Sequence, residues 1–277
     1  ISGILHIIAY VGFVVINIEL IEIVLDGLLG THRLFAPYMG SMYNVLIATF
    51  EVFAALVFIS VVIFWLRRNA IKIMRFWKPE LKGWPKKDAD YILYFELILM
   101  TLFLSMNATD ALLQQRNEPH YIQAGLFPVS QFLAPVFSSL SVATLVILER
   151  TFWWLHITGI LIFLNYLYYS KHLHILLAFP NTYFQNLNPL GSFRNNKTVT
   201  QEVKLMMDPS ADPYAAPAGN VADKFGASDV TDLNRIQLLN AYTCTECGRC
   251  TDVCPANQTG KTLSPRKIMM DTRDRLE

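Results

Sequence analysis

Long apolar runs fill residues 1–180 of the chain, whereas residues 181–277 are polar and carry scattered proline, glycine and asparagine. A helix needs about 20 apolar residues to cross ~30 Å of hydrocarbon. Three segments satisfy this length (4–29, 43–66 and 152–178), and a fourth, 91–108, is shorter but flanked by polar residues. Composition agrees, because hydrophobic residues make up 53% of the chain and charged residues only 16%. The pattern predicts a mainly α-helical protein that begins with a membrane domain.

The segment 126–148 is ambiguous, because it is apolar but contains Pro128 and Pro135. Charge helps to place it. The loop 67–87 contains eight lysines and arginines against the single acid Glu80, and such an excess is typical of cytoplasmic loops. A solvated run of charge is the alternative interpretation. With this loop inside, we expect four crossings of the inner (cytoplasmic) membrane, with 126–148 along the outer surface and the polar part of the chain in the cytoplasm.

All the cysteines of the chain form one run, C-x2-C-x2-C-x3-C followed by proline, and they are Cys244, Cys247, Cys250 and Cys254. This spacing is that of the 4Fe-4S clusters of bacterial ferredoxins. A structural zinc site would use two separated C-x2-C pairs, and a c-type haem would need C-x-x-C-H. In two-cluster ferredoxins the fourth cysteine of such a run serves the other cluster. We therefore expect two clusters, one of them shared with cysteines beyond residue 277.

Histidines are the second chemical signal. His156 and His174 lie 18 residues apart in the predicted span 152–178, which equals five helical turns and ~27 Å of rise. One histidine near each membrane surface, on a shared face, suits the axial ligation of two stacked b-type haems. Two interfacial histidines that only hydrogen-bond their neighbours are the alternative.

A family resemblance supports the haem hypothesis. The stretch Leu155–Gly159 through Tyr169–Ile175, ending at Phe179-Pro180, resembles the last span of the respiratory nitrate reductase gamma subunit, a dihaem cytochrome b. That family also has two haem histidines 18 residues apart on this span, and its earlier haem helix resembles Leu5-His6-Ile7. The resemblance covers about residues 4–180 and implies a four-helix cytochrome b-type bundle.

The histidine pairs are less complete than in that family. We expect His6 and His174 to share a cytoplasmic-side haem, because both lie at the inward ends of antiparallel helices. The family's second histidine on the first helix corresponds to Ile16 here, so the partner of His156 is open. His32 is the candidate, with His120 as a weaker substitute, and one or two haems are compatible with the sequence.

Residues 181–228 are predicted to be a linker, because asparagine, proline and glycine recur along this segment. Residues 229–277 are predicted to be the N-terminal half of a ferredoxin-like domain. Asp229 or Thr231 is a suitable cap for a short helix through Leu239, and Ser264-Pro265 is suited to begin another helix to about Leu276.

The run Cys244–Ala256 resembles the N-terminal ferredoxin module of heterodisulfide reductase-like iron–sulfur subunits, and residues 256–266 extend the match. In that group such modules can follow a nitrate-reductase-gamma-like membrane domain. The resemblance implies electron transfer between a soluble donor, such as an electron-transfer flavoprotein, and the quinone pool. Membrane lipid and quinone are the other expected partners, and no nucleic acid is expected. The alternative is a non-catalytic electron conduit, or a membrane anchor that senses redox state in a larger complex.

Two further features concern the first span. Glu19, Glu22 and Asp26 share one stripe of the expected helix. They are suited either to carry protons to a quinone site or to pair with basic residues of a helix upstream of residue 1. The chain starts without methionine inside an apolar helix, so we expect it to be a piece of a longer protein.

Overall fold

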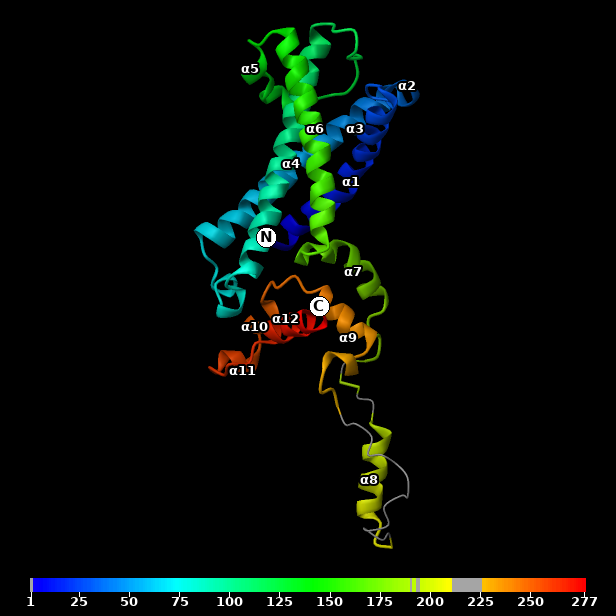
Figure 1. Ribbon diagram of the computed structural model, residues 1–277, viewed down its shortest axis with the longest axis vertical. Helices are drawn as coiled ribbons and strands as arrows, with labels where there is room; N and C mark the ends of the chain where they lie inside the picture. Colours follow the sequence, from blue (N-terminus) through cyan, green and yellow to red (C-terminus); the bar gives the residue numbers. More distant parts are fainter. Residues whose placement is uncertain (1, 190, 193–194, 211–225) are drawn as a thin grey trace. The chain divides into compact units, whose positions relative to one another are not determined.

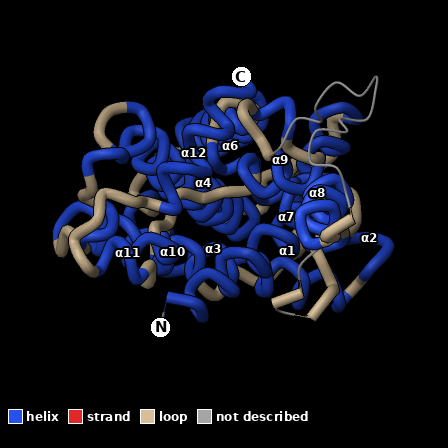
Figure 2. Tube along the Cα trace, turned by 90° about the horizontal axis from the view of Figure 1, so that it is seen from below, coloured by secondary structure: helices blue, strands red, loops and turns tan. Residues whose placement is uncertain are grey.

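The computed structural model describes residues 2–189, 191–192, 195–210 and 226–277, and within these ranges every regular element is a helix (Figures 1 and 2). The mainly α-helical class is therefore confirmed. The chain divides into two compact units. One contains the residues up to Leu173 together with Glu246–Val253, and the other contains His174–Thr245 together with Cys254–Glu277.

Among the described residues, four helices are long and apolar enough to cross a membrane, as predicted. They are α1 (Ser2–Leu29), α3 (Ser41–Trp65), which continues as the π-helix η1 (Leu66–Ala70), α4 (Trp84–Gln115) and α6 (Val142–Leu167). In Figure 1 they lie side by side as a bundle, in which α1 packs on α3, α3 on α4, and α4 on α6. The protein is thus a helical membrane protein.

The helices pack closely around a core formed mostly by α3 and α4. Tyr43, Ile47 and Phe50 of α3 are fully buried, as is Phe103 of α4. On the α1 side, a Cβ at Gly12 would lie 2.5 Å from Val57 Cγ2, so only glycine allows this approach of α1 to α3. Because the polar side chains described below also lie inside the bundle, its interior is not purely apolar.

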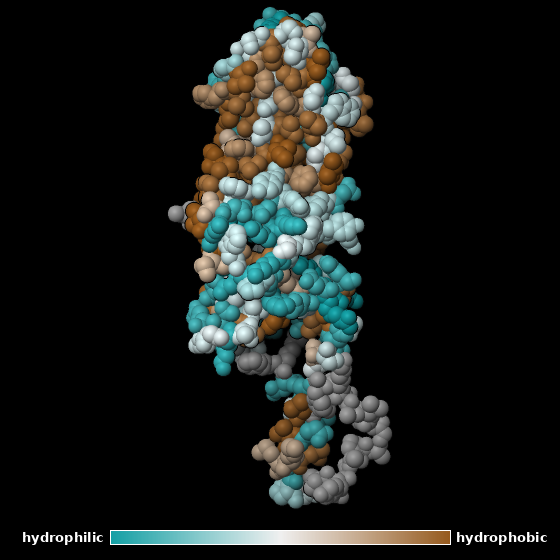
Figure 3. All heavy atoms as spheres, turned by 60° about the vertical axis from the view of Figure 1, so that its left-hand side comes forward, coloured by the Kyte–Doolittle hydropathy of each residue, from teal (hydrophilic) through white to brown (hydrophobic). Residues whose placement is uncertain are grey.

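The outer faces of the long helices are apolar. Many large hydrophobic side chains of α1 are exposed, such as Ile4 at 65% and Leu28 at 78%. In Figure 3 hydrophobic side chains cover most of the visible face over the long helices. Exposed apolar area of this extent is unfavourable in water and matches the hydrocarbon of a bilayer.

Short elements close the two ends of the bundle. One end carries α2 (Ala36–Met39), η4 (Ser130–Phe132) and α5 (Ala134–Phe137), and α2 and α5 are seen at the top of Figure 1. The other end carries η2 (Met74–Phe76) and η3 (Pro79–Leu81). The ambiguous segment 126–148 does not form a span of its own: η4 and α5 occupy its first part, and α6 begins at Val142 behind the Ser141 cap.

The predicted span 152–178 is wrong at both ends, because α6 covers Val142–Leu167. After Leu167 the chain turns and forms η5 (Lys171–Leu173), and a separate helix, α7, runs from His174 to Tyr183. Asp88 of α4 explains the break. Its carboxylate accepts hydrogen bonds from the Tyr166 hydroxyl at 2.5 Å, the Ser170 hydroxyl at 2.6 Å and the Lys171 amide at 3.2 Å. These bonds hold the chain in a turn where hydropathy alone predicts a continuous helix.

The third span is longer than predicted, because α4 extends well beyond 91–108 in both directions. The polar residues that marked its expected ends, Asp88, Asn107 and Asp110, are buried with partners. They lie inside the helix and do not terminate it.

The remaining elements are short helices: α8 (Lys197–Met207), η6 (Val230–Asp232), α9 (Arg235–Tyr242), α10 (Arg249–Asp252), α11 (Pro255–Gln258) and α12 (Pro265–Leu276). The predicted helix from Pro265 is confirmed, with the Ser264 hydroxyl accepting from the Lys267 amide at 3.3 Å. Asp229 caps η6, whereas Asn234 caps α9. Part of the predicted linker 181–228 lies outside the described residues, and the predicted domain boundaries and ferredoxin module stay predictions.

Candidate functional site

The cysteine run lies among short helices and turns. Cys244 follows α9, Cys250 lies within α10, and Cys254 is the N-cap of α11 with Pro255 behind it. None of the four cysteines, all of which the structure describes, forms a disulfide, and Cys250 is exposed. Gly248 has a φ of 75°, and Glu246 reaches 56° without being glycine, so the backbone turns tightly between the first three cysteines. Four thiolates on such a short, turning backbone are the donor set that iron–sulfur clusters use.

Within the part of the chain that the structure describes, no group of three or more His, Cys, Asp or Glu side chains is arranged to hold a metal ion. The ligand set Cys244, Cys247, Cys250 and Cys254 therefore stays a prediction that rests on residue type and spacing.

The segment Glu246–Val253 is tied to one end of the bundle by a buried lysine. Lys171 donates to the Pro85 carbonyl at 2.6 Å and to the carboxylate of Glu246, and it lies 3.9 Å from Asp88 Oδ2. The side chains of Lys171 and Glu246 are only 7% and 3% exposed. Burial lowers the pKa of Lys171, although the carboxylates of Glu246 and Asp88 oppose this shift. Lys171 thus joins the helix-ending cluster around Asp88 to the loop between Cys244 and Cys247.

We expect the Lys171→Met variant to release this loop while leaving the bundle folded. A hydrogen bond between charged groups contributes about 1.5–3 kcal/mol, so hydrogen exchange of residues 246–253 should accelerate about tenfold or more. Hydrogen-exchange mass spectrometry measures this directly. The control is Lys267→Met, which breaks an exposed pair with Asp271 at 2.7 Å and should leave the exchange of residues 246–253 unchanged. Equal exchange in wild type and Lys171→Met would mean that the lysine does not hold the loop.

His156, the histidine of α6 predicted to bind haem, is enclosed between helices. It is 2% exposed, its Nδ1 lies 3.1 Å from the Leu99 carbonyl of α4, and its ring packs against Phe103. A Cβ at Gly159 would lie 2.8 Å from Leu99 Cδ2, so α4 and α6 are in close contact beside the imidazole. The Nδ1 contact is one that haem-ligating histidines also make.

The other predicted haem histidines lie in different surroundings. His174 begins α7 and does not continue α6, so the shared helix face predicted for these two histidines is wrong. His6 is exposed on α1. His32 lies 3.2 Å from Asp110 through Nε2 and accepts from the Ile122 amide at 3.3 Å through Nδ1, so both of its nitrogens are engaged. The haem ligands among these histidines stay a prediction.

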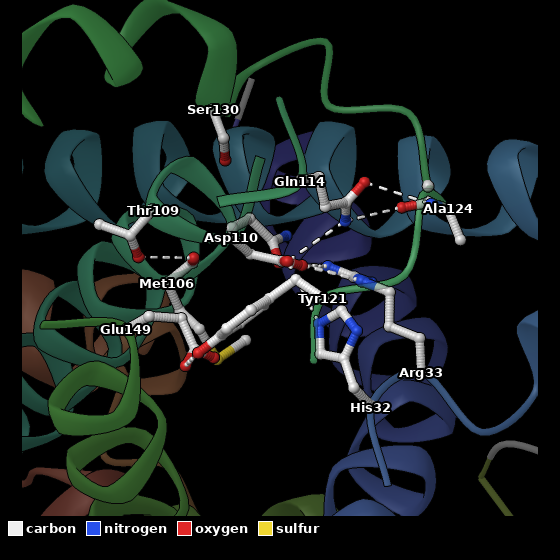
Figure 4. A network of polar contacts seen from close by, with 12 residues as sticks. His32, Arg33, Met106, Thr109, Asp110, Gln114, Tyr121, Ala124, Ser130 and Glu149 are labelled. Atoms are coloured by element: carbon white, nitrogen blue, oxygen red, sulfur yellow. Dashed lines mark hydrogen bonds and ion pairs between the residues drawn. The ribbon is translucent and has the colours of Figure 1, made fainter. Parts of the chain in front are cut away.

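The opposite end of the bundle, which carries α2 and α5, contains a buried network of charged and polar groups (Figure 4). Its centre is Arg33, which donates to Asp110 Oδ2 at 2.5 and 2.9 Å and to Asn107 Oδ1 at 3.2 Å. Burial by itself would lower the pKa of Arg33, but Asp110, Tyr43 and Glu19 together outweigh it and raise the pKa above its ordinary value. The guanidinium is therefore charged inside the protein. Arg33 has a φ of 53°, an unfavourable backbone conformation that these contacts hold in place.

Acidic side chains surround this ion pair, and nearly all of them have identified donors. Glu22 accepts from the Tyr43 hydroxyl and the Phe35 amide, both at 2.8 Å. Asp26 accepts from the Thr31 hydroxyl at 2.6 Å and the Arg33 amide at 2.8 Å. For these two acids the partners come from the loop after α1 and from α3, so the pairing with an upstream helix that the sequence also allowed is not needed.

Two further acids belong to the network. Glu51, fully buried in α3, accepts from the amides of Val129 and Ser130 and from Asn107. Glu149 of α6 accepts from the Tyr121 hydroxyl at 2.8 Å and pairs with Arg150 at 2.5 Å. Burial, together with the Glu149 carboxylate, raises the pKa of Tyr121 above its ordinary value, so its hydroxyl keeps its proton and donates.

A small polar cavity of about 40 Å³ lies within this network. It is lined from α1, the following loop, α4 and α6 by Glu19, Glu22, Ile23, Asp26, Thr31, His32, Arg33, Met106, Asp110, Glu149, Arg150 and Trp153. Among these residues, the sequence singled out the acidic stripe of α1 and His32, the latter as a candidate haem ligand. Charged residues within the apolar spans are the signal that would have revealed the others, since an ionisable group in a membrane is costly unless it is paired or functional.

The chain is similar to three curated proteins. It is 28% identical over 275 residues to the Bacillus subtilis protein named "Probable iron-sulfur-binding oxidoreductase FadF", an alignment that covers 99% of this chain and 34% of that protein. It is 28% identical over 196 residues to the "EtfAB:quinone oxidoreductase" of Syntrophomonas wolfei subsp. wolfei, covering 69% of this chain and 24% of that protein. It is also 41% identical over 46 residues to the "Probable membrane-anchored ferredoxin" of Chromohalobacter salexigens, covering 17% and 7%.

The chain thus spans about a third or less of the curated relatives it matches. No protein-family model matches it, and no solved structure is similar to it. Four membrane-spanning helices, a ferredoxin-type cysteine run and relatives named as iron–sulfur oxidoreductases and a ferredoxin are mutually consistent. They describe a membrane protein that is similar to iron–sulfur oxidoreductases.

Proposed function

We propose that this chain is the membrane-bound part of an oxidoreductase that passes electrons between a soluble donor and the quinone pool. The observation that carries the proposal is the ferredoxin-type cysteine run in a chain with four membrane spans, with its loop held to the bundle by Lys171 and Glu246. The relative named as an EtfAB:quinone oxidoreductase supports quinone and an electron-transfer flavoprotein as the partners.

In this proposal Cys244, Cys247, Cys250 and Cys254 hold 4Fe-4S clusters, which supply one-electron redox chemistry when bound. The chain's own residues position that chemistry. Lys171 and Asp88 fix the loop between Cys244 and Cys247 against the end of the bundle that carries the basic loop 67–87. By the excess of positive charge in this loop, that end faces the cytoplasm, where a soluble donor has access.

The experiment is a quinone reoxidation assay on the full-length protein, purified in detergent and reduced without oxygen. The electron paramagnetic resonance signal of reduced clusters should appear and then disappear when a water-soluble quinone analogue is added. A reduced-minus-oxidised visible spectrum of the same sample tests haem b. A b-type band would support the ligands predicted among His6, His32, His156 and His174, and its absence would remove them.

The second candidate is a non-catalytic electron conduit or redox-sensing anchor, which the relative named as a membrane-anchored ferredoxin favours. In that case the clusters form and are reduced, but added quinone does not reoxidise them. The same assay therefore separates the two functions.

A further inference from the structure

The polar cavity in the first unit contains one acid that its surroundings do not satisfy. Glu19 of α1 lines the cavity and is 3% exposed, and its Oε2 atom is buried without a hydrogen-bond partner. The other acids that line it, Glu22, Asp26, Asp110 and Glu149, all accept the hydrogen bonds described above. Glu19 is thus the member of the cavity lining that has capacity for a further ligand.

The charges around the cavity favour a proton as that ligand. Among the described residues, five carboxyl groups line it against two guanidinium groups and one imidazole. Arg33 is committed to Asp110, and Arg150 to Glu149. A buried carboxylate oxygen without a hydrogen-bond donor is strongly disfavoured, and the group becomes neutral most directly by taking up a proton.

The cavity also provides a medium for exchange. Its volume of about 40 Å³ is enough for a water molecule, because a cavity needs about 10–15 Å³ of such space, and two to four polar partners, to hold one. It lies at the end of the bundle formed by the loops after α1 and α4, next to His32 and Arg33 of the first of these loops. The cavity is therefore lined both by Glu19, which lies in the apolar span α1, and by residues of the loop at the polar end of the bundle.

We propose that Glu19 is a proton-exchange site that loads from, and discharges to, the aqueous phase at this end of the bundle through water in the cavity. In loading, a proton leaves a cavity water and forms an O–H bond on Glu19, and the water regains a proton from the bulk. Unloading is the reverse, so the site changes by one proton and no electrons. This activity goes beyond the proposed electron transfer and does not require it.

The groups that face Glu19 set its proton occupancy, and they come from every element around it. These are Glu22 and Asp26 of α1, His32 and Arg33 of the following loop, Tyr43 and Glu51 of α3, Asp110 of α4, and Glu149 and Arg150 of α6. Because most of these groups already have hydrogen-bond or ion-pair partners, Glu19 is the group that can gain or lose a proton without breaking an existing contact.

Infrared difference spectroscopy between acidic and alkaline buffer tests the proposal on the purified protein. We expect a carboxylic-acid carbonyl band that is present at acidic pH, disappears as the pH rises, and shifts promptly in D₂O. E19Q, which keeps the side-chain shape, should lose this band. The control E202Q removes an exposed glutamate of α8 that is not part of the cavity lining and should retain the band.

Two results would overturn the proposal: a wild-type band that does not respond to buffer pH, or one that persists unchanged in E19Q. E19D provides a second variant in case E19Q is unstable, and it should shift the band without abolishing it. The measurement needs neither clusters nor quinone, so a failure here is distinct from a failure of the quinone reoxidation assay.

Discussion

The Asp110→Ala variant is expected to lose about 3–5 kcal/mol of stability, which is the usual cost of leaving one partner of a buried ion pair uncompensated. Arg33 is 6% exposed and gives Asp110 two of its hydrogen bonds. Without the carboxylate, its guanidinium is enclosed at the end of the bundle with Tyr43 and Asn107 as its remaining hydrogen-bonding partners. Unfolding of the detergent-solubilised protein in a denaturing-detergent titration measures the change in free energy.

Two matched variants identify the cause. Asp110→Asn keeps a hydrogen-bond acceptor but removes the charge, and it should fall between wild type and Asp110→Ala. The double variant Arg33→Met/Asp110→Leu removes both charges and should recover much of the loss, because apolar replacement of a buried pair is often neutral. If Asp110→Ala unfolds at the same detergent concentration as wild type, the ion pair does not stabilise this end of the bundle.

Hydropathy and charge were sufficient to predict the number of spans, because crossing a bilayer imposes a length and a composition on each helix. The segment 126–148 adds no span of its own, as predicted, because its first part forms the short helices η4 and α5, but the prediction was wrong for residues 142–148, which belong to the span α6. The helix from Pro265 was also predictable, because its cap is a local signal two residues long.

The ends of α4 and α6 were not predictable from local pattern, because they depend on contacts far apart in sequence. Asp88 stops α6 through Tyr166 and Ser170, which lie 78 and 82 residues away from it. The same is true of the polar network, where Arg33 and Asp110 are separated by 77 residues. From hydropathy alone, each of these charged residues is expected to mark the end of a span. In the fold they are buried, with hydrogen-bond partners from other elements.

The interpretation of the histidine spacing also depends on contacts between distant parts of the chain. A spacing of 18 residues predicts a shared helix face only if the helix is continuous, and the Asp88 turn removes that condition between His156 and His174. The cysteine run is different, because its chemistry depends on residue type and on spacing within eleven residues. Its prediction therefore does not depend on how distant parts of the chain pack.

Replacing Cys247 with serine in the full-length protein is expected to abolish one iron–sulfur cluster, since each iron of a 4Fe-4S cluster needs its own thiolate ligand. Iron and acid-labile sulfide should fall, and one set of cluster signals should be lost from the electron paramagnetic resonance spectrum of the reduced protein. The bundle should remain folded, because Cys247 is not among the residues of its hydrophobic core, and the detergent titration verifies this.

The Cys254→Ser variant is the matched comparison, because it also replaces a thiol with a hydroxyl. Cys254 lies within ten residues of each of the other three cysteines. In two-cluster ferredoxins the fourth cysteine of the run serves the other cluster, so Cys254→Ser should remove a different signal from the one lost in Cys247→Ser. If both variants lose the same signal, all four cysteines serve one cluster, and the second cluster is not needed. If neither loses iron, the cysteines are not cluster ligands, and the proposed electron transfer loses its basis.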